Sequence, residues 1–357
     1  MKSKVYFVPV SKADSGEIVK KKLKTLLEKS GVLGVVERGD KVAAKIHFGE
    51  EGNTGYVDPE LAGVICRAAV EKGGEVYLAD TNVLYKGSRT VTADHIKLAL
   101  KHGFSKNATG VDIFIPDDTK KEETLEIAIG QKYIRTAKVG RFFIDCDSLV
   151  TISHFKGHML TGFGGAIKNL GMGCATRQGK LAQHNNLAPA VYPDNCVACG
   201  ACVAICPVNA LTLKGDNAKI SLDAKKCIGC ANCVGVCSTF SLFVDFTAGS
   251  AVQEKMAEYA FAVLRNKKKK AVFINFAMKI NKECDCWGGE NPGIAPDVGI
   301  FASLDPVAID KASYDIVNRV CKKNVFRSAH PDQDGTIQIT HAEKIGLGRQ
   351  EYDLVEV

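Results

Sequence analysis

The run Cys196-Val-Ala-Cys199-Gly-Ala-Cys202-Val-Ala-Ile-Cys206-Pro207 and its near copy Cys227-Ile-Gly-Cys230-Ala-Asn-Cys233-Val-Gly-Val-Cys237-Ser238 decide how the chain is organised. Each run has the spacing Cys-x2-Cys-x2-Cys-x3-Cys, which is typical of bacterial ferredoxins with two [4Fe–4S] clusters. In such proteins the fourth cysteine of each run ligates the other cluster. The spacing therefore predicts one cluster on Cys196, Cys199, Cys202 and Cys237, and a second on Cys227, Cys230, Cys233 and Cys206.

Paired zinc sites and a disulfide framework are the alternatives for such runs. Zinc takes four ligands in two pairs, without a crossed fourth ligand. Disulfide frameworks are typical of short secreted chains, whereas this chain has 357 residues. Small residues between the cysteines allow the chain to wrap tightly around a cluster. We therefore interpret residues 188–246, the cysteine segment, as a two-cluster ferredoxin-like α+β domain.

The composition is that of a soluble globular protein, with 46% hydrophobic and 24% charged residues. The first ten residues do not resemble a signal peptide, and no apolar run is long enough to span a membrane. The 14 cysteines without an export signal predict a reducing cytoplasm, and oxygen-labile clusters favour an anaerobe.

The formal charge of +7 lies outside the cysteine segment, which has four Lys and four Asp. The run Lys267 to Lys270 is typical of a solvated helix end, so we do not expect nucleic-acid binding. A small anionic substrate or an acidic redox partner protein is a better use of the positive charge.

Strand-like and helix-like stretches alternate on both sides of the cysteine runs. Strands are expected at 4–10, 41–48, 75–80, 111–115, 148–154, 270–278 and 298–303, with an antiparallel excursion at 122–129 and 133–136. Helices are expected at 16–29, 59–71, 93–101, 252–264, 306–320 and 341–345. This pattern predicts a mostly parallel sheet sandwiched by helices. Residues 1–187 and 247–357, the host region, would form one α/β domain into which the cysteine segment is inserted.

Polar residues follow several of the expected strands, where ligands bind in open α/β sheets. They are Lys45, His47, Glu50, Glu51, Asn53, Asp80, Thr81, Asn82, His154, Lys156, His158, Asp297 and Asp305. We expect them to share one pocket. His154 and His158 are candidate acid–base groups or metal ligands, although a histidine pair in a loop is often only hydrogen-bonded.

The glycines after His158 suggest an anion or cofactor site at the start of a helix. Gly162, Gly164 and Gly165 could present backbone N–H groups, with Lys168 adding charge. The alternative is a tight turn before a helix. The stretch matches neither the P-loop nor the dinucleotide fingerprint, so it indicates no nucleotide.

Three cysteines of the host region are further candidates. Cys284 and Cys286 could bind an extra soft metal with partners from elsewhere, or act in redox chemistry, and a disulfide across that spacing would be strained. Cys174 has basic neighbours that could activate a thiol, but a lone cysteine is more often a small buried side chain.

Taken together, these motifs resemble the uncharacterised family called domain of unknown function 362, in its form with an internal two-cluster ferredoxin. The resemblance is carried by Lys45-Ile-His47, Leu78-Ala-Asp80, residues 154–169, Gly171-Met-Gly-Cys174, Lys180, His184, Cys284-Asp-Cys286 and Ser303-Leu-Asp-Pro306. It implies iron–sulfur binding and assigns no roles to pocket residues. The chain is also distantly similar to the nickel-dependent lactate racemase superfamily.

The sequence therefore predicts a cytoplasmic iron–sulfur oxidoreductase. Electrons from a redox partner would pass through two [4Fe–4S] clusters to a substrate or cofactor in the host pocket. Lys45 and Lys168 would hold anionic groups, and His47, His154 or His158 would transfer protons. The alternatives are a non-catalytic electron carrier or adaptor, and a metal-dependent non-redox enzyme with structural clusters. An additional flavin or metal stays open.

Overall fold

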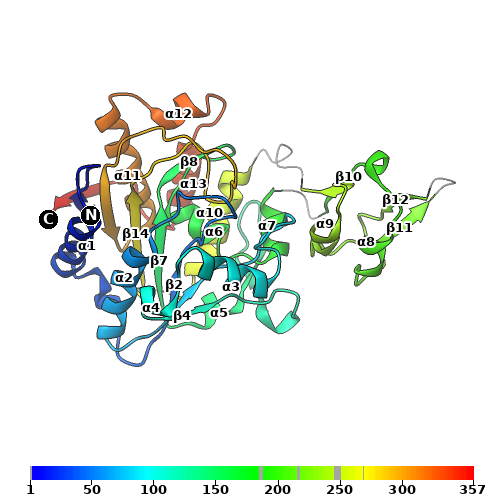
Figure 1. Cartoon of the computed structure of the whole chain (residues 1–357), viewed down its shortest axis with the longest axis horizontal. Coiled ribbons are helices and arrows are strands. Elements are labelled where there is room, and N and C mark those ends of the chain that lie inside the picture. Colours follow the sequence, from blue (N-terminus) through cyan, green and yellow to red (C-terminus); the bar gives the residue numbers. More distant parts are fainter. Residues whose placement is uncertain (1, 185–187, 215–217, 245–250, 268) are drawn as a thin grey trace.

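An eight-stranded sheet with helices on both faces forms the centre of the computed structural model, which describes residues 2–184, 188–214, 218–244, 251–267 and 269–357 (Figure 1). Its strands are, in spatial order, β16 (Tyr352–Glu356), β1 (Ser3–Pro9), β15 (Gly299–Ser303), β14 (Ala271–Ala277), β7 (Ser148–His154), β2 (Lys41–Lys45), β3 (Glu75–Ala79) and β4 (Asp112–Phe114). Within this sheet β15 is antiparallel to both of its neighbours, and the other pairs are parallel.

The central strands are apolar on both sides because helices cover both faces. On β14, Val272 and Ile274 point into one apolar core and Phe273 points into the other. The first core lies under α1 (Gly16–Ser30) and α2 (Pro59–Glu71), and the second lies under α6 (Ala166–Gly171), α10 (Val252–Leu264) and α11 (Pro306–Cys321).

Local sequence fixes where two of these helices begin. Asp58 accepts a hydrogen bond from the Glu60 N–H, and Pro59 occupies the first turn of α2. Asp305 accepts hydrogen bonds from the N–H groups of Val307 and Ala308 at the start of α11, which also begins with a proline. These caps explain why α2 has the predicted bounds.

The remaining elements of the host region are short or peripheral. They are η1 (Val32–Val35), α3 (Thr92–Lys101), α4 (Lys106–Thr109), η2 (Lys121–Glu123), α5 (Arg141–Asp145), α7 (Arg177–His184), α12 (Val325–Ala329) and α13 (Thr336–Lys344), with the antiparallel pairs β5 (Thr124–Ala128) with β6 (Thr136–Gly140), and β8 (Lys156–His158) with β9 (Gly162–Gly164).

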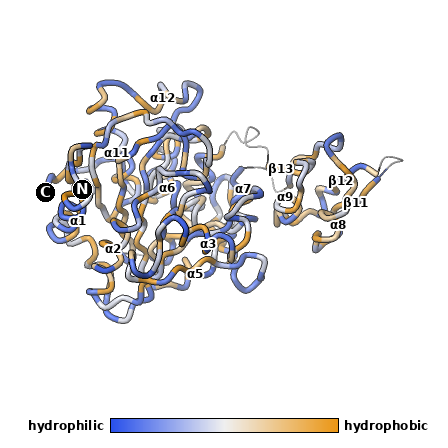
Figure 2. Tube along the Cα trace, in the orientation of Figure 1, coloured by the Kyte–Doolittle hydropathy of each residue, from blue (hydrophilic) through white to orange (hydrophobic). Residues whose placement is uncertain are grey.

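The cysteine segment contains only short elements and lies at one end of the molecule, with α9 toward the host region (Figure 1). They are β10 (Ala190–Val191), η3 (Pro193–Asn195), α8 (Ala201–Ala204), β11 (Leu211–Lys214), β12 (Lys219–Leu222), α9 (Asn232–Val236) and β13 (Leu242–Phe243). Apolar and polar residues alternate closely along it (Figure 2). Its apolar cluster, which includes Leu211, Ile220 and Val234, also takes in Leu84 and Leu181 of the host region.

The structure confirms a mixed α/β fold with a mostly parallel central sheet, and strands from both sides of the cysteine segment lie in that sheet. Two predicted elements have the wrong bounds. The second strand of the antiparallel pair was expected at 133–136 and is β6, and the final helix was expected at 341–345 and is part of the longer α13. Strand β16 and helices α5, α7 and α12 were not predicted. The predicted borders at 187/188 and 246/247 involve residues outside the described ranges.

None of the described helices has both the length and the apolar character needed to cross a lipid bilayer.

Candidate functional site

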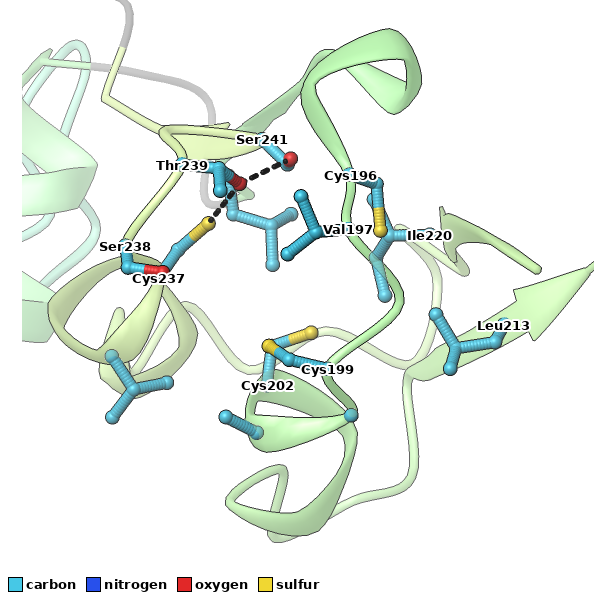
Figure 3. A pocket seen from close by; sticks show the side chains of 14 residues that line it. Cys196, Val197, Cys199, Cys202, Leu213, Ile220, Cys237, Ser238, Thr239 and Ser241 are labelled. Carbon is cyan, nitrogen blue, oxygen red and sulfur yellow. Dashed lines mark hydrogen bonds between the residues drawn. The ribbon is translucent and has the colours of Figure 1, made fainter. Parts of the chain in front are cut away.

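The cysteine segment contains two small cavities, and each is lined by four cysteines. Cys196, Cys199, Cys202 and Cys237 line the first cavity (Figure 3). Cys206, Cys227, Cys230 and Cys233 line the second. All eight are free thiols in the structure. The two sets are those that the crossed spacing predicts, with each fourth cysteine facing the cavity of the other run.

The two runs wrap their cavities with the same backbone turns. The residues two positions after the first cysteine, Ala198 and Gly229, have φ of 56° and 69°. Four positions after it, Gly200 and Ala231 have φ of 75° and 58°. Such left-handed conformations favour small residues. The N–H groups of Ala198 and Gly229 each donate to the first sulfur of their run at 3.4 Å.

The eight cysteines form no disulfide in the structure, which argues against a disulfide framework. Among the described residues, no group of three or more His, Cys, Asp or Glu side chains is found that could hold a metal ion. The assignment of the eight cysteines to two iron–sulfur clusters therefore stays a prediction.

A larger cavity, of about 430 Å³, lies in the host region beyond the carboxyl ends of β2, β3 and β7. It is lined by His47, Asp80, Thr81, Val83, Leu84, Tyr85, Arg89, His154, Lys156, His158, Met159, Leu160, Thr161, Lys168, Asn169, Met172, Gly173, Lys180, His184, Val252, Glu283, Cys284, Cys286 and Trp287. The structure therefore brings His47, His154, His158 and Lys168 to one cavity, together with the Cys284–Cys286 pair.

Lys45 does not line this cavity, contrary to the expectation that it holds a ligand. Its Nζ lies 3.0 Å from Asp80 Oδ1 and donates to Asn169 Oδ1 at 2.7 Å and to the Ile46 carbonyl at 3.1 Å. These contacts account for all three of its hydrogens. Burial alone would raise the pKa of Asp80, but the charge of Lys45 holds that pKa below its usual range. Lys45 therefore positions Asp80.

His154 has hydrogen-bond partners at both ring nitrogens, and its predicted role in proton transfer stays a prediction. Nδ1 lies 2.7 Å from Asp285 Oδ1, and Nε2 lies 3.0 Å and 3.1 Å from the carbonyls of Met278 and Lys279. Burial would raise the pKa of Asp285, but His154 and Lys156 hold it well below its usual range.

His47 is neutral and packed among charged neighbours. Its ring nitrogens face two donors, the Gly49 N–H at 3.0 Å and Arg89 Nη1 at 2.9 Å. Burial and the charge of Arg89 depress the pKa of His47 well below its usual range. Arg89 also donates through Nε to Glu50 Oε2 at 3.0 Å. The nearby guanidinium favours an uncharged ring, and the one acceptor nitrogen of such a ring is already used by the Gly49 N–H or by Arg89.

His158 and Lys168 retain free polar atoms toward the cavity. His158 Nδ1 accepts from the N–H groups of Leu160 and Thr161 at 3.1 Å and 3.2 Å, so its hydrogen is on Nε2. Burial and then the charge of Lys168 depress the pKa of His158 well below its usual range. Lys168 Nζ makes no hydrogen bond or ion pair with a described residue, and burial lowers its pKa to about 7.

The glycines predicted to bind an anion or cofactor instead permit close packing. The N–H groups of Ala166 and Ile167, which begin α6, donate to the Asp310 carboxylate at 2.7 Å and 2.9 Å. A Cβ on Gly165 would lie 2.3 Å from Asp310 Oδ1, and one on Gly162 would lie 2.9 Å from Gly335. A Cβ on Gly164 would meet Lys168. A carboxylate of the protein itself thus occupies the expected anion position.

Two aspartates expected at the pocket lie elsewhere. Asp305 caps α11 and lies at the ends of the strands that are opposite to the cavity. This is because β15 is antiparallel to its neighbours, so its carboxyl end points away from the cavity. Asp297 precedes β15 and accepts the Lys279 N–H at 2.6 Å. Glu50, Glu51, Asn53 and Asn82 also do not line the cavity, although Glu50 reaches its wall through Arg89.

Cys284 and Cys286 are joined by a disulfide in the structure, and a metal or redox role for the pair stays a prediction. Cys174 is buried, as its lone position favours, and burial raises its pKa to about 12. In the lysine run, Lys267 is buried and donates to the Ile144 carbonyl at 2.6 Å, whereas a solvated side chain was expected. Lys268 lies outside the described residues.

Arg89 and Tyr85 are cavity residues that the sequence did not indicate. They lie in a stretch without regular structure between β3 and α3, so neither periodicity nor a strand end marks them. Tyr85 donates to Glu50 Oε2 at 2.9 Å, and Arg89 Nη2 donates to the Tyr85 hydroxyl at 2.6 Å. The only available signal was the unusual placement of a large aromatic and a cation in a loop rich in small residues.

Comparison with known proteins places the chain in a family. The model of the family described as "Domain of unknown function (DUF362)" matches residues 42–315. No curated protein matches significantly. A protein from Thermotoga maritima has a similar structure, with 14% identity and a TM-score of 0.44 over 87% of this chain and 59% of that one. The lactate racemase apoprotein from Thermoanaerobacterium thermosaccharolyticum gives 15% identity and a TM-score of 0.41 over 78% and 51%. This chain thus spans little more than half the length of either structure.

Proposed function

The chain belongs to the DUF362 family, and on that premise we propose that it is a cytoplasmic iron–sulfur oxidoreductase that moves electrons into the host cavity. The observation that carries this proposal is the sorting of eight cysteines into two cavities with four thiols each. Neither zinc nor a disulfide framework requires that each run supply its fourth cysteine to the other cavity.

The eight cysteines would hold two [4Fe–4S] clusters. When bound, such clusters supply one-electron transfer at potentials set by charge, solvent exposure and hydrogen bonds to sulfur. The chain supplies N–H donors for this purpose at Ala198, Ala210 and Gly229, which lie 3.2–3.4 Å from cysteine sulfurs. Cys199 is exposed, so the first cavity is the one that a redox partner protein would approach.

The second cavity lies on the side of the cysteine segment that meets the host region. Helix α9 carries Cys233, and its Gly235 packs closely against Thr90, whose Cγ2 would lie 3.2 Å from an added Cβ. Leu84 belongs both to the apolar cluster of the segment and to the wall of the host cavity. A continuous packed region therefore joins the second cavity to the host cavity.

The host cavity is suited to a small anionic substrate or cofactor. Lys168 offers an ammonium group without a protein partner among the described residues, and His158 offers an Nε2–H. Arg89, Lys156 and Lys180 add positive charge around them, although each is already bound to the protein. Lys168 would hold the anion, and His158 would donate a hydrogen bond to the oxygen at which negative charge develops.

The test begins with the anaerobically reconstituted protein. We expect about eight irons per chain and bleaching of the iron–sulfur absorbance on reduction. The reduced protein is then mixed with small anionic acceptors, and reoxidation is compared in Lys168→Ala, His158→Ala and the exposed control Lys97→Ala. Loss of reoxidation in the first two variants, with iron content unchanged, supports the proposal.

Two outcomes would contradict it. Reoxidation that is the same in all variants would mean that the chain is an electron carrier whose host cavity takes no part. A protein that reconstitutes without iron would remove electron transfer altogether. Metal in excess of the expected iron would instead favour a metal-dependent enzyme with structural clusters.

A further inference from the structure

The Cys284–Cys286 disulfide lies in the wall of the host cavity, in the loop between β14 and β15. Asp285, between the two cysteines, is directed into the protein and is held by His154 at 2.7 Å and Lys156 at 3.3 Å. The next residue, Trp287, is 48% exposed and also lines the cavity. The loop is therefore fixed at its centre, while the cysteines on either side of Asp285 line the cavity.

We propose that this disulfide is a redox-active group that accepts two electrons inside the host cavity. This inference rests on the proposed function, in which the electrons come from the iron–sulfur clusters of the cysteine segment. Each sulfur takes one electron and one proton, the S–S bond breaks, and two thiols form. The protons enter from solvent through the open cavity. The pair is thereby reduced by two electrons, which the clusters deliver one at a time, at a position beside the anion site.

A direct structural connection joins the disulfide to the cysteine segment. Thr90 packs beside Gly235 of α9, and its Oγ1 donates to the Tyr85 carbonyl at 2.8 Å. The Tyr85 hydroxyl in turn lies 3.3 Å from the Cys286 carbonyl. One short stretch of chain therefore contacts α9 at one end and the disulfide loop at the other. Electrons from the second cysteine cavity would arrive at the host cavity at this point.

The surroundings favour reversible chemistry over a structural role for the bond. The two cysteines are separated by one residue, so the bond closes no large loop and restricts the unfolded chain little. Disulfides of cytoplasmic proteins are usually transient and catalytic. The ion pairs of Asp285 with His154 and Lys156 hold the loop independently of the S–S bond, so the bond can open without releasing the loop.

The experiment counts electrons and thiols in the reconstituted protein. The oxidised protein is titrated anaerobically with reduced methyl viologen, then alkylated, and the modified cysteines are located by mass spectrometry. We expect wild type to take up about two electrons more per chain than Cys284→Ser/Cys286→Ser, and Cys284 and Cys286 to be alkylated only after reduction. Cys321→Ser, which changes a half-buried thiol on α11, should behave like wild type. The variant Cys284→Ala/Cys286→Ala repeats the count without the added hydroxyls.

The outcomes separate the two proposals. Clusters that reduce normally while Cys284 and Cys286 remain unalkylated, or are alkylated equally before reduction, would overturn the redox disulfide and leave the proposed function standing. Equal electron uptake in wild type and both double variants would do the same. Absence of iron, measured on the same sample, would overturn the proposed function and the inference with it.

Discussion

The cysteine segment and the host cavity bring reactive groups together in opposite ways. The eight cysteines lie between residues 196 and 237, in short elements with few buried neighbours, and seven of the eight are at least partly exposed. The groups of the host cavity range from His47 to Trp287 and meet only because β2, β3 and β7 are adjacent in one sheet. The segment would be held together by what it binds, and the cavity is held together by its own buried ion pairs.

The largest expected effect is on the segment. Cys233→Ser removes one sulfur from the second cavity and should cost about four of the expected eight irons per chain. Because bound metal supplies folding free energy to small domains, proteolysis should then cut within residues 188–246 while the host region stays intact. Iron analysis and limited proteolysis measure both effects.

Cys321→Ser is the matched control for this change, because Cys321 is a partly buried thiol outside the segment. It should retain all of the iron. Full iron content in Cys233→Ser would show that iron binding by the segment does not require Cys233. It would contradict the view that the segment, unlike the host cavity, is held together by what it binds.

The next largest effect concerns the buried pair of the host region. Lys45→Met leaves Asp80 without the cation 3.0 Å away, in a place where both side chains are almost fully buried. Removing one partner of a buried ion pair lowers the free energy of unfolding by about 3–5 kcal/mol. Denaturant unfolding of the reconstituted protein measures the loss, and the iron content should not change.

Lys97→Met tests the same chemistry at the surface. Lys97 and Asp94 form an exposed pair at 3.1 Å on α3, and such pairs contribute at most about 1 kcal/mol. A loss in Lys45→Met no larger than in Lys97→Met would mean that the buried pairs do not hold the cavity together.

This contrast also explains how much of the molecule the sequence predicts. The bounds of α2 and β7 were predicted in full from local sequence. Helix α2 starts with a capping residue and a proline, and β7 is a buried, largely apolar run, and both features can be recognised without the rest of the chain. The direction of β15 could not be predicted, because it depends on strands distant in sequence. Strand β16 was missed because it is an edge strand with three of its five residues exposed and none fully buried, so it lacks a buried apolar run.

The candidate sites follow the same division. Cysteine ligand spacing is local, so the two sets of four could be assigned from the sequence alone. In the host cavity the sequence indicated which residues gather at the strand ends, but not which of them face a ligand. Lys45 faces Asp80 and His154 faces Asp285, whereas Lys168 and His158 keep free atoms. That difference depends on partners 35 or more residues away.

A third prediction concerns pH and the anion site. Lys168 has a pKa lowered to about 7 by burial, so its ammonium form prevails below pH 7 and is lost above it. Affinity for sulfate, whose own charge is constant in this range, should fall about tenfold per pH unit above 7. Isothermal titration calorimetry between pH 6 and 8.5 measures this dependence.

Two variants isolate Lys168 from the other cations of the cavity. Lys168→Arg keeps a permanent charge and should flatten the pH profile, while Lys168→Met should weaken sulfate binding throughout. A profile that keeps its slope in Lys168→Arg would assign the titration to another group, for which Lys180, with a pKa also lowered to about 7 by burial, is the alternative.

The smallest effect returns to the segment and asks whether a single contact there tunes a cluster. Thr239 Oγ1 lies 3.8 Å from Cys237 Sγ and 2.9 Å from Ser241 Oγ (Figure 3). Toward a thiolate ligand the hydroxyl must donate, and this stabilises the more negative, reduced state. Thr239→Val should therefore lower the reduction potential of the first cluster by a few tens of millivolts. The shift is small because the whole hydrogen bond contributes about 1.5–3 kcal/mol, and the potential depends only on the difference in its strength between the oxidised and reduced states.

A redox titration followed by electron paramagnetic resonance measures the shift, with Thr212→Val on β11 as the control for loss of a hydroxyl elsewhere in the segment. If the potential stays the same while the iron content is full, the hydroxyl does not reach the ligand sulfur. The properties of the first cluster would then depend on the cysteine spacing, which is local in sequence, and not on this hydroxyl.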